Sequence, residues 1–354
     1  MTDNLGAWDD VRHLTETSSV WAIDAANYPV TDSLEQLRFL VGYAILAPST
    51  HNTQPWRFVV TGDRIDLWSD PSRSLPQIDP DQRQLFMSCG AALMNLRLAI
   101  RRFGHSERVL YLPDARHPDL IASVSPDEAA RPAPRDRALF DAIVRRRTNR
   151  DPFLDRPIGQ DLANEIMKEA ADQQAWMVRL ESHDKLTVAY AIAEADRRRF
   201  ADATYRDELS HWLVPRGSDR RDGIPMVKKD VATALPLVAP IAVRHLDRGG
   251  VIASHEAALT THAPMLAVLG TELDEPLAWL WAGQALEAVF LRATSHDVAM
   301  SFLNQVVEDA EMRDVIADAS NHSGVPQLVL RFGYGPPQLA TPRRPLADVL
   351  SPVT

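Results

Sequence analysis

The predicted order of helices and strands occurs twice along this chain. Each half reads as helix, strand, long helix, strand, and each long helix carries a patch of small residues, Cys89-Gly90-Ala91-Ala92 in the first half and Ala282-Gly283-Gln284-Ala285 in the second. Such a repeat predicts a duplication. The length of 354 residues agrees, because it exceeds what one ordinary core holds. We therefore expect an α+β fold with two related halves fused in one chain.

The individual elements are predicted from hydrophobic spacing and turn residues. A first helix follows Asp32, which caps it and forms a capping box with Glu35. Gly62-Asp63, between two short strands, predicts a hairpin. The remaining helices are expected at about 80–103, 135–147, 161–171, 185–200, 277–295 and 308–317, and the strands at 56–61, 64–69, 109–111, 175–180, 298–303 and 327–332.

Two stretches interrupt this pattern. Residues 113–135 are rich in Pro, Asp and Ala, which predicts a linker. We therefore place the first half at residues 1–130 and the second at 131–354. Residues 205–265 show no clear periodicity, and we interpret them as a long loop or lid, since connections of that length are often functional.

Composition excludes several classes of protein. The formal net charge of −10 argues against a general nucleic-acid binder, because phosphate backbones need a positive surface. Cys89 is the single cysteine, so an internal disulfide cannot form, which suits a reducing compartment. The first ten residues do not resemble a signal peptide, and no apolar run approaches the ~20 residues that cross a bilayer. We expect a soluble, cytoplasmic protein that binds no nucleic acid and no membrane.

Several well-known catalytic motifs are absent. The sequence has no G-x-G-x-x-G after a strand, no Walker A phosphate loop and no G-x-S-x-G elbow. His255-Glu256 is followed by His262 and not by a histidine at the fifth position, so the H-E-x-x-H spacing of a zinc protease, which places both histidines on adjacent turns of one helix face, is absent. We therefore expect no metal site.

The first segment with candidate chemistry is the turn Ala47–Trp56, between an apolar helix and a strand. Its polar side chains, Ser49, Thr50, Asn52 and Gln54, offer donors and acceptors that suit the edge of a planar heterocycle. The alternative interpretation is a helix stop followed by an ordinary polar turn, with Trp56 in the core.

Two further segments are basic. Arg145–Arg150 holds four arginines in six residues at the end of a helix, and guanidinium groups bind phosphate oxygens in pairs. The alternative is a solvated cap whose cations complement the helix dipole. Arg343-Arg344, near the chain end, would by itself be interpreted as an exposed basic tail.

These strings resemble the nitroreductase family. APSTHNTQPWRFVV is similar to its signature turn, IVRRRTNRDPF to the arginine segment that holds the flavin phosphate, and LVLRFGYGPPQLATPRRPL to its closing strand and basic tail. Thr148 replaces the usual Ser and keeps the hydroxyl. The layout, together with the string Arg221–Pro225, resembles the Acg-type mycobacterial branch. The resemblance implies a nitroreductase-like fold and an FMN cofactor.

The order of the segments implies a fused pseudo-dimer. In the family, one subunit supplies the arginine segment and tail and its partner supplies the turn, with the flavin between them. Here the first half carries the turn and the second half carries the arginines, so one composite site is implied and the protein is expected to be a monomer. The residues implied to bind the cofactor are Pro48, Ser49, Thr50, Asn52, Gln54, Arg146, Arg147, Thr148, Arg150, Met300, Arg343 and Arg344.

The resemblance also implies roles and a reaction. Arg146, Arg147 and Thr148 would bind the FMN phosphate, Arg343 or Arg344 would close that site, and Arg150 would approach the ring. NAD(P)H would reduce the flavin, which would then reduce a small-molecule electron acceptor, a nitro compound or a quinone. The alternative is a flavin-sequestering protein in which residues 205–265 cover the ring. A third interpretation is a family member that binds no flavin.

Overall fold

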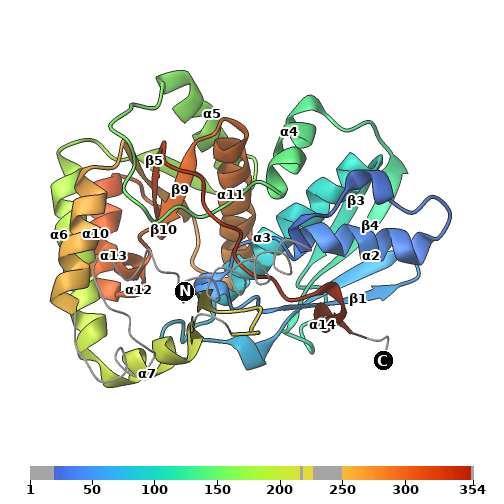
Figure 1. Ribbon diagram of the computed structural model, residues 1–354, viewed down its shortest axis with the longest axis horizontal. Helices are drawn as coiled ribbons and strands as arrows, with labels where there is room; N and C mark the ends of the chain where they lie inside the picture. Colours follow the sequence, from blue (N-terminus) through green and yellow to red (C-terminus); the bar gives the residue numbers. More distant parts are fainter. Residues whose placement is uncertain (1–19, 216–217, 226–248, 352–354) are drawn as a thin grey trace, which may run out of the picture.

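The first lobe of the molecule contains a five-stranded sheet (Figure 1). The computed structural model describes residues 20–215, 218–225 and 249–351. In chain order the elements of this lobe are α2 (Ser33–Ala44), β1 (Trp56–Thr61), β2 (Arg64–Ser69), α3 (Arg83–Arg102), β3 (His105–Tyr111), β4 (Leu120–Ala129), α4 (Pro134–Ile143), α14 (Leu346–Val349) and β11 (Leu350–Ser351). The strand order is β11-β1-β2-β4-β3, with β11 parallel to β1 and the other pairs antiparallel.

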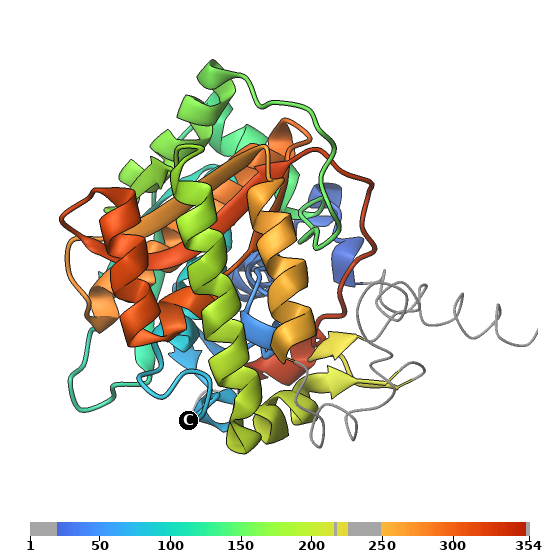
Figure 2. The ribbon, with the colours of Figure 1, turned by 90° about the vertical axis from the view of Figure 1, so that its left-hand side faces the viewer.

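The second lobe contains a four-stranded antiparallel sheet in the order β5-β8-β10-β9. Its elements are α5 (Gln160–Ala171), β5 (Trp176–Arg179), α6 (Asp184–Ala201), α7 (Ala203–Trp212), β6 (Leu213–Val214), β7 (Ile224–Pro225), α10 (Gly249–Thr261), β8 (Met265–Thr271), α11 (Pro276–Ser295), β9 (Ala299–Phe302), α12 (Gln305–Glu308), α13 (Ala310–Ser320) and β10 (Val325–Gly333). Figure 2 shows α6 and α10 side by side in front of this sheet. The described chain is α+β, as predicted, with one sheet in each lobe.

Helix α2 and strands β1 and β2 lie where the capping residue and the turn residues in the sequence predicted them. The Asp32 carboxylate accepts hydrogen bonds from the backbone N–H groups of Leu34 and Glu35, so it caps α2 as expected. Strands β1 and β2 have the predicted bounds, and Gly62 between them adopts a φ of 54°, which a hairpin turn requires. These elements are defined by residues close together in sequence, so the sequence alone predicts them.

The predicted linker at 113–135 is wrong, because β4 occupies its middle. This strand lies inside the first sheet and pairs with β2 on one side and β3 on the other. Its second half contains Pro126 and Asp127, which produced the linker-like composition. Cross-strand pairing, which composition does not report, makes this segment a strand.

The stretch 205–265 is not the long loop that the sequence suggested. Where the structure describes it, it contains most of α7, the short parallel pair β6 and β7, and α10. Residues 216–217 and 226–248 lie outside the described residues. Helix α7 escaped prediction because its apolar positions are few, and α10 because its apolar residues are spread around the helix and give almost no amphipathic pattern.

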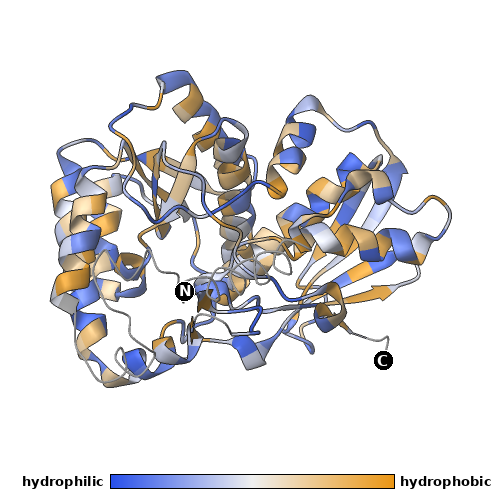
Figure 3. Ribbon diagram, in the orientation of Figure 1, coloured by the Kyte–Doolittle hydropathy of each residue, from blue (hydrophilic) through white to orange (hydrophobic). Residues whose placement is uncertain are grey.

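Strand β8 was missed for a different reason, since all seven of its residues are buried. Met265, Ala267 and Leu269 pack on one face of the sheet with α5 and α11. Leu266 and Val268 pack on the other face with α6, α12 and α13. A strand covered on both faces shows no polar alternation, so its sequence cannot be distinguished from a buried helix turn. The outer helices, in contrast, alternate hydrophilic and hydrophobic colours in Figure 3.

The long helices α3 and α11 pack against each other through their small-residue patches. A Cβ atom added to Gly90 would lie 2.3 Å from the carbonyl oxygen of Leu280, and one added to Gly283 would lie 2.0 Å from that of Met87. Only glycine permits such an approach of two backbones. The patches that suggested a duplication are therefore the surfaces by which the two halves meet.

The end of the chain crosses from the second lobe to the first. After β10 the tail descends to α14 beside β1, as the red segment in Figure 1 shows. Phe58 and Val59 of β1 pair with Leu350 and Ser351 of β11. The first sheet is therefore completed by the last residues of the second half.

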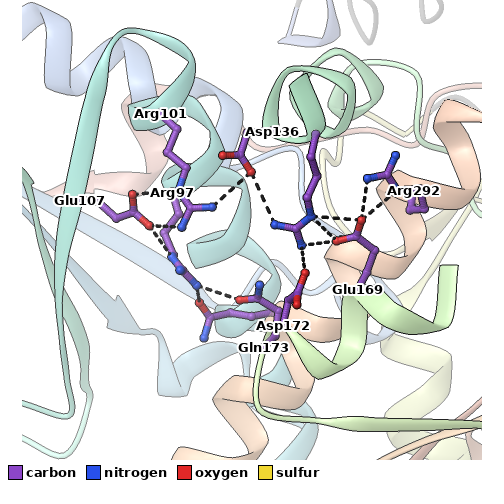
Figure 4. A network of polar contacts seen from close by, with 10 residues as sticks. Arg97, Arg101, Glu107, Asp136, Glu169, Asp172, Gln173 and Arg292 are labelled. Atoms are coloured by element: carbon purple, nitrogen blue, oxygen red, sulfur yellow. Dashed lines mark hydrogen bonds and ion pairs between the residues drawn. The ribbon is translucent and has the colours of Figure 1, made fainter. Parts of the chain in front are cut away.

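A network of ion pairs also joins the halves (Figure 4). Glu107 accepts from Arg97 and Arg101 of α3, and Arg101 continues to Asp136 of α4. Glu169 of α5 lies at the other end of the network, where it binds Arg135 of α4 and Arg292 of α11. The network links α3, α4, α5 and α11 at the junction between the lobes. Among the described helices, none is both long and apolar enough to span a membrane.

Candidate functional site

A cavity of about 310 Å³ lies between the two lobes and is lined by residues of both. The first lobe contributes the turn at Pro48–Asn52, and the second contributes α6, α10, β9 and α12. The chain end contributes Thr341 and Arg343. This size and position are typical of a small-molecule site between two structural units.

The turn that enters the cavity has an unusual backbone. His51, Asn52 and Gln54 all have positive φ, at 50°, 55° and 52°. Asparagine and histidine are found in this conformation more often than other residues, whereas glutamine adopts it at a cost on the order of 1–2 kcal/mol. Such strain persists only where the surroundings enforce it, and it is often found at functional sites.

Hydrogen bonds hold the turn in this shape. Ser49 Oγ accepts from the backbone N–H of Gln54 at 2.9 Å. The Asn52 side chain bridges three segments: its amide donates to the carbonyl oxygens of Gly223 and Pro342, and its carbonyl oxygen accepts from Arg343. Asn52 therefore fastens the turn, the 218–225 segment and the tail together.

The arginine segment begins where α4 ends. Arg146 is buried and donates to the carbonyl oxygen of Leu46 at 2.9 Å. Its Nε lies 3.4 Å from Glu287 of α11, which is also fully buried. Burial raises the pKa of Glu287 to about 7, although Arg146 opposes the shift. Burial also lowers the pKa of Arg146.

Two further guanidinium groups converge on the same place. Arg147, Arg343 and Arg146 have their guanidinium carbons 3.9, 5.0 and 5.9 Å from the centre of the Trp21 ring. Burial lowers the pKa of Arg147 to about 10, and burial together with Arg146 and Arg147 lowers that of Arg343 well below its ordinary value. Within the described residues, these three guanidinium groups make one ion pair, between Arg146 and Glu287. This end of the cavity therefore holds more positive charge than negative.

Most of the predicted site residues surround the cavity. Those that line it are Pro48, Ser49, Thr50, Asn52, Arg146, Arg147, Thr148, Arg150 and Arg343. The structure thus brings together the turn of the first half and the arginines of the second, although they are about a hundred or more residues apart in sequence.

Gln54, Arg344 and Met300 do not line the cavity. Gln54 Oε1 accepts from the backbone N–H of Arg344 at 2.7 Å, and the Arg344 guanidinium donates to Gln54 O and Asp348 O, so this pair anchors the tail. Met300 lies in strand β9 with its side chain in the core of the second lobe. Its backbone carbonyl accepts from Asn149 N–H, which fixes the arginine segment from outside the cavity.

The wall formed by α6, α7, α10 and α12 was not predicted from the sequence. It carries Asp196, Tyr205, Glu256 and Glu308. Burial raises the pKa of all four, that of Asp196 to about 7. No short string marks these residues, because they come from separate helices and meet only through tertiary packing. For Glu287, the sequence did contain a signal of a buried functional group, because it is the lone carboxylate in the apolar sequence of α11.

His51 was also passed over, although it lies in the predicted turn. It lines the cavity, and its Nε2 is buried without a hydrogen-bond partner in the described structure. Burial, with contributions from Arg150 and Arg199, lowers its pKa to about 4. The imidazole is therefore neutral at physiological pH.

Comparison with known proteins gives the class of this protein. No family model matches the chain. Over 328 residues it is 33% identical to the "Putative NAD(P)H nitroreductase Rv3131" of Mycobacterium tuberculosis H37Rv. This alignment covers 89% of this chain and 91% of the relative. Over 323 residues it is 29% identical to the "Putative NAD(P)H nitroreductase acg" of the same strain, covering 88% and 94%. The chain belongs to the nitroreductase family, and the Acg-type relationship predicted from its motifs is confirmed.

Solved structures of nitroreductases also overlap with part of the chain. One is the FMN-dependent nitroreductase NfnB from Mycobacterium smegmatis in complex with NADPH. Its superposition covers 60% of this chain and 96% of the NfnB chain, at 16% sequence identity and a TM-score of 0.38. A nitroreductase with bound FMN from Bacteroides fragilis matches 56% and 88% at 18% identity, with a TM-score of 0.35. The family assignment rests on the sequence relatives.

Proposed function

We propose that the cavity binds FMN and that the protein is an NAD(P)H-dependent oxidoreductase. The observation that carries this proposal is the convergence of Arg146, Arg147 and Arg343 at one end of the cavity. A phosphate would balance their excess positive charge, and each planar guanidinium can bind its oxygens in pairs. The Trp21 indole N–H donates to Thr341 O at 2.9 Å, which fixes the ring as one wall of this end.

The charge at this end of the cavity fits a phosphate group. Nε of Arg146 faces the buried carboxyl group of Glu287 at 3.4 Å, and Nε of Arg343 is buried without a hydrogen-bond partner in the described structure. Burial raises the pKa of Glu287 to about 7, so this one carboxyl group does not balance three guanidinium groups. The remaining positive charge supports the assignment of Arg146 and Arg343 to phosphate binding, with Arg147 beside them.

The remaining lining residues suit the flavin ring. Pro48, Ser49 and Thr50 would lie along its edge, and Arg150 would stabilise negative charge on the reduced ring. The bound flavin supplies the hydride chemistry, and the protein supplies position and electrostatics. The names of the relatives support NAD(P)H as the donor, and we propose a nitro compound or a quinone as the acceptor.

The proposal is tested by anaerobic mixing of the FMN-loaded protein with NADPH and with NADH, while the flavin absorbance is followed. Bleaching at a rate that saturates with nucleotide supports the oxidoreductase. No bleaching by either nucleotide, with dithionite still reducing the flavin, contradicts it in favour of flavin sequestration. Failure to bind FMN in a fluorescence titration contradicts the proposal as a whole.

A further inference from the structure

Two carboxyl groups face the cavity from helices that pack side by side. Asp196 lies on α6 and Glu256 on α10, and both line the cavity (Figure 2). Asp196 is 4% exposed, and its Oδ2 accepts from Gln305 Nε2 at 3.3 Å. The carboxyl group of Glu256 makes no hydrogen bond within the described residues. Neither group contributes to the proposed phosphate site.

The charges around this pair come from every helix that packs on it. On the acidic side, Glu308 of α12 adds a third carboxylate, and it is paired with Arg199 of α6 at 2.5 Å. Because Arg199 is paired with Glu308, it offsets only part of the rise in the pKa of Asp196. On the basic side, His255, Arg331 and Arg150 act on Glu256. Tyr205 of α7 completes the wall.

Two buried carboxyl groups that repel each other do not both ionise at neutral pH. Burial, together with the charge of Glu256, raises the pKa of Asp196 to about 7. Burial likewise raises the pKa of Glu256. The pair therefore retains a proton near neutral pH, in a wall that faces the cavity.

Polar side chains from other elements line this part of the cavity as well. Arg331 of β10 is 1% exposed; its Nη atoms donate to Asp151 O and Asn149 O, and its Nε has no hydrogen-bond partner among the described residues. The buried Nε2 of His51 has none there either. Arg150 acts electrostatically on both His51 and Glu256, so it connects the turn to the acidic wall. The carboxyl pair therefore lies in a polar part of the cavity, which suits a polar acceptor.

We propose that Asp196 donates the proton that the electron acceptor takes up together with a hydride. This inference rests on the proposed function, because it assigns a group to the second half of that reaction. A quinone that receives a hydride on one oxygen carries the electron pair to its other oxygen, which then takes the proton from the Asp196 carboxyl group. The product is the neutral hydroquinone, and the Asp196 carboxylate recovers a proton from water. General acids of this kind work best when their pKa lies near the working pH.

The first test separates proton transfer from electron transfer. Protein carrying FMN reduced with dithionite is mixed with a quinone or with ferricyanide, which accepts electrons without a proton. We expect Asp196→Asn to slow reoxidation by the quinone by about 10- to 100-fold and to remove its decline above pH 7, with the ferricyanide rate unchanged. Glu194→Gln, on the same helix but paired with Arg197 and Arg198, should leave both rates unchanged. Equal slowing with both acceptors, or an unchanged quinone rate, would overturn the proposal.

The second test needs no flavin and no activity. The difference between infrared spectra of the flavin-free wild type and Asp196→Asn should contain a carboxylic acid C=O band that titrates near pH 7. The band of Glu287, whose pKa is also raised to about 7, is common to both proteins and cancels in the difference. Glu256→Gln should move the midpoint of the Asp196 band to lower pH, because it removes the repelling charge. The absence of a titrating band from the difference spectrum would overturn the inference. The infrared measurement does not depend on NAD(P)H oxidation. If only the proposed function is wrong, NAD(P)H does not bleach the flavin but the Asp196 band is still observed.

Discussion

Gly90 of α3 and Gly283 of α11 lie against each other where the two halves meet. A Cβ atom on Gly90 would be only 3.1 Å from the Cα atom of Gly283. Each glycine also contacts a backbone carbonyl of the opposite helix, so the arrangement is reciprocal. Reciprocal contact of this kind is what a two-fold interface between identical subunits produces. The junction of the halves therefore keeps the form of a subunit interface.

Alanine at either glycine should destabilise the protein. Overpacking costs about 1–3 kcal/mol, and alanine regains at most about 1 kcal/mol in helix propensity, so we expect a net loss of about 1–2 kcal/mol. Urea unfolding of Gly90→Ala and Gly283→Ala measures it. Gly250→Ala in α10, where no atom lies within 4 Å of the added Cβ, is the matched control and should be neutral or slightly stabilising. Wild-type stability in both interface variants would refute the close packing.

Glu169→Gln should weaken the ionic network between the halves. The carboxylate is buried and serves both Arg135 and Arg292, so its neutralisation leaves two arginines without their shared counter-charge. We expect a loss of about 2–3 kcal/mol in the free energy of unfolding, since Arg135 is partly exposed and retains Asp172. Glu35→Gln, in an exposed pair with Arg38, should change stability by less than about 0.5 kcal/mol. Equal effects of the two substitutions would show that the network adds nothing to the junction.

Arg146→Ala should reduce affinity for FMN. In the proposed site, the substitution removes a buried partner of the phosphate, and a charge-assisted hydrogen bond contributes about 1.5–3 kcal/mol, which corresponds to roughly 10- to 100-fold in Kd. Fluorescence titration with FMN measures the change. Arg145→Ala is the matched control, because Arg145 is its neighbour in sequence but lies half-exposed in a pair with Asp297. Equal affinity of the Arg146 variant and the wild type would remove this residue from the site.

Glu287 and Asp196 should make stability depend on pH. Burial raises the pKa of each to about 7, from 4.5 and 3.8. The folded protein therefore keeps protons that the unfolded chain releases from about pH 4 upward, so stability falls as the pH rises toward and through 7. Each group contributes at most about 1.4 kcal/mol per pH unit. Glu287→Gln should make the decline between pH 5 and 7 shallower in urea unfolding of the flavin-free protein, and an unchanged slope would contradict the raised pKa.

We expect the protein to be a monomer of 39.4 kDa. The surface that would join two subunits is already used between α3 and α11, so fusion removes the main reason to dimerise. Light scattering during size-exclusion chromatography measures the mass. A stable dimer at micromolar concentration would mean that another face has become an interface.

The candidate site residues that line the cavity come from segments whose chemistry is local. The turn at Pro48–Asn52 and the arginine segment are contiguous strings, and residues of both line the cavity. Asp196 and Glu256 were missed because each is one carboxylate on a helix, and only tertiary packing places them together. Trp21 was missed because it belongs to a segment with weak periodicity whose position depends on the arginines it covers.

The same distinction explains the errors in the fold. Strands β1 and β2 are set by alternation and by a glycine turn, which are visible in sequence. Strand β4 owes its structure to neighbours on both sides, and β8 to helices on both faces. Partners that are distant in sequence supply the stabilising contacts of these two strands, and a single sequence does not name them.

The pairing of β11 with β1 means that covalent continuity is not what holds the two halves together. The exposed connection between β4 and α4, at residues 130–133, could be cut without opening either sheet, and the last strand would still be bound to the first lobe. Two separately made polypeptides divided at this point would reassemble into the same molecule, as a heterodimer. Each lobe could then be varied or labelled independently of the other.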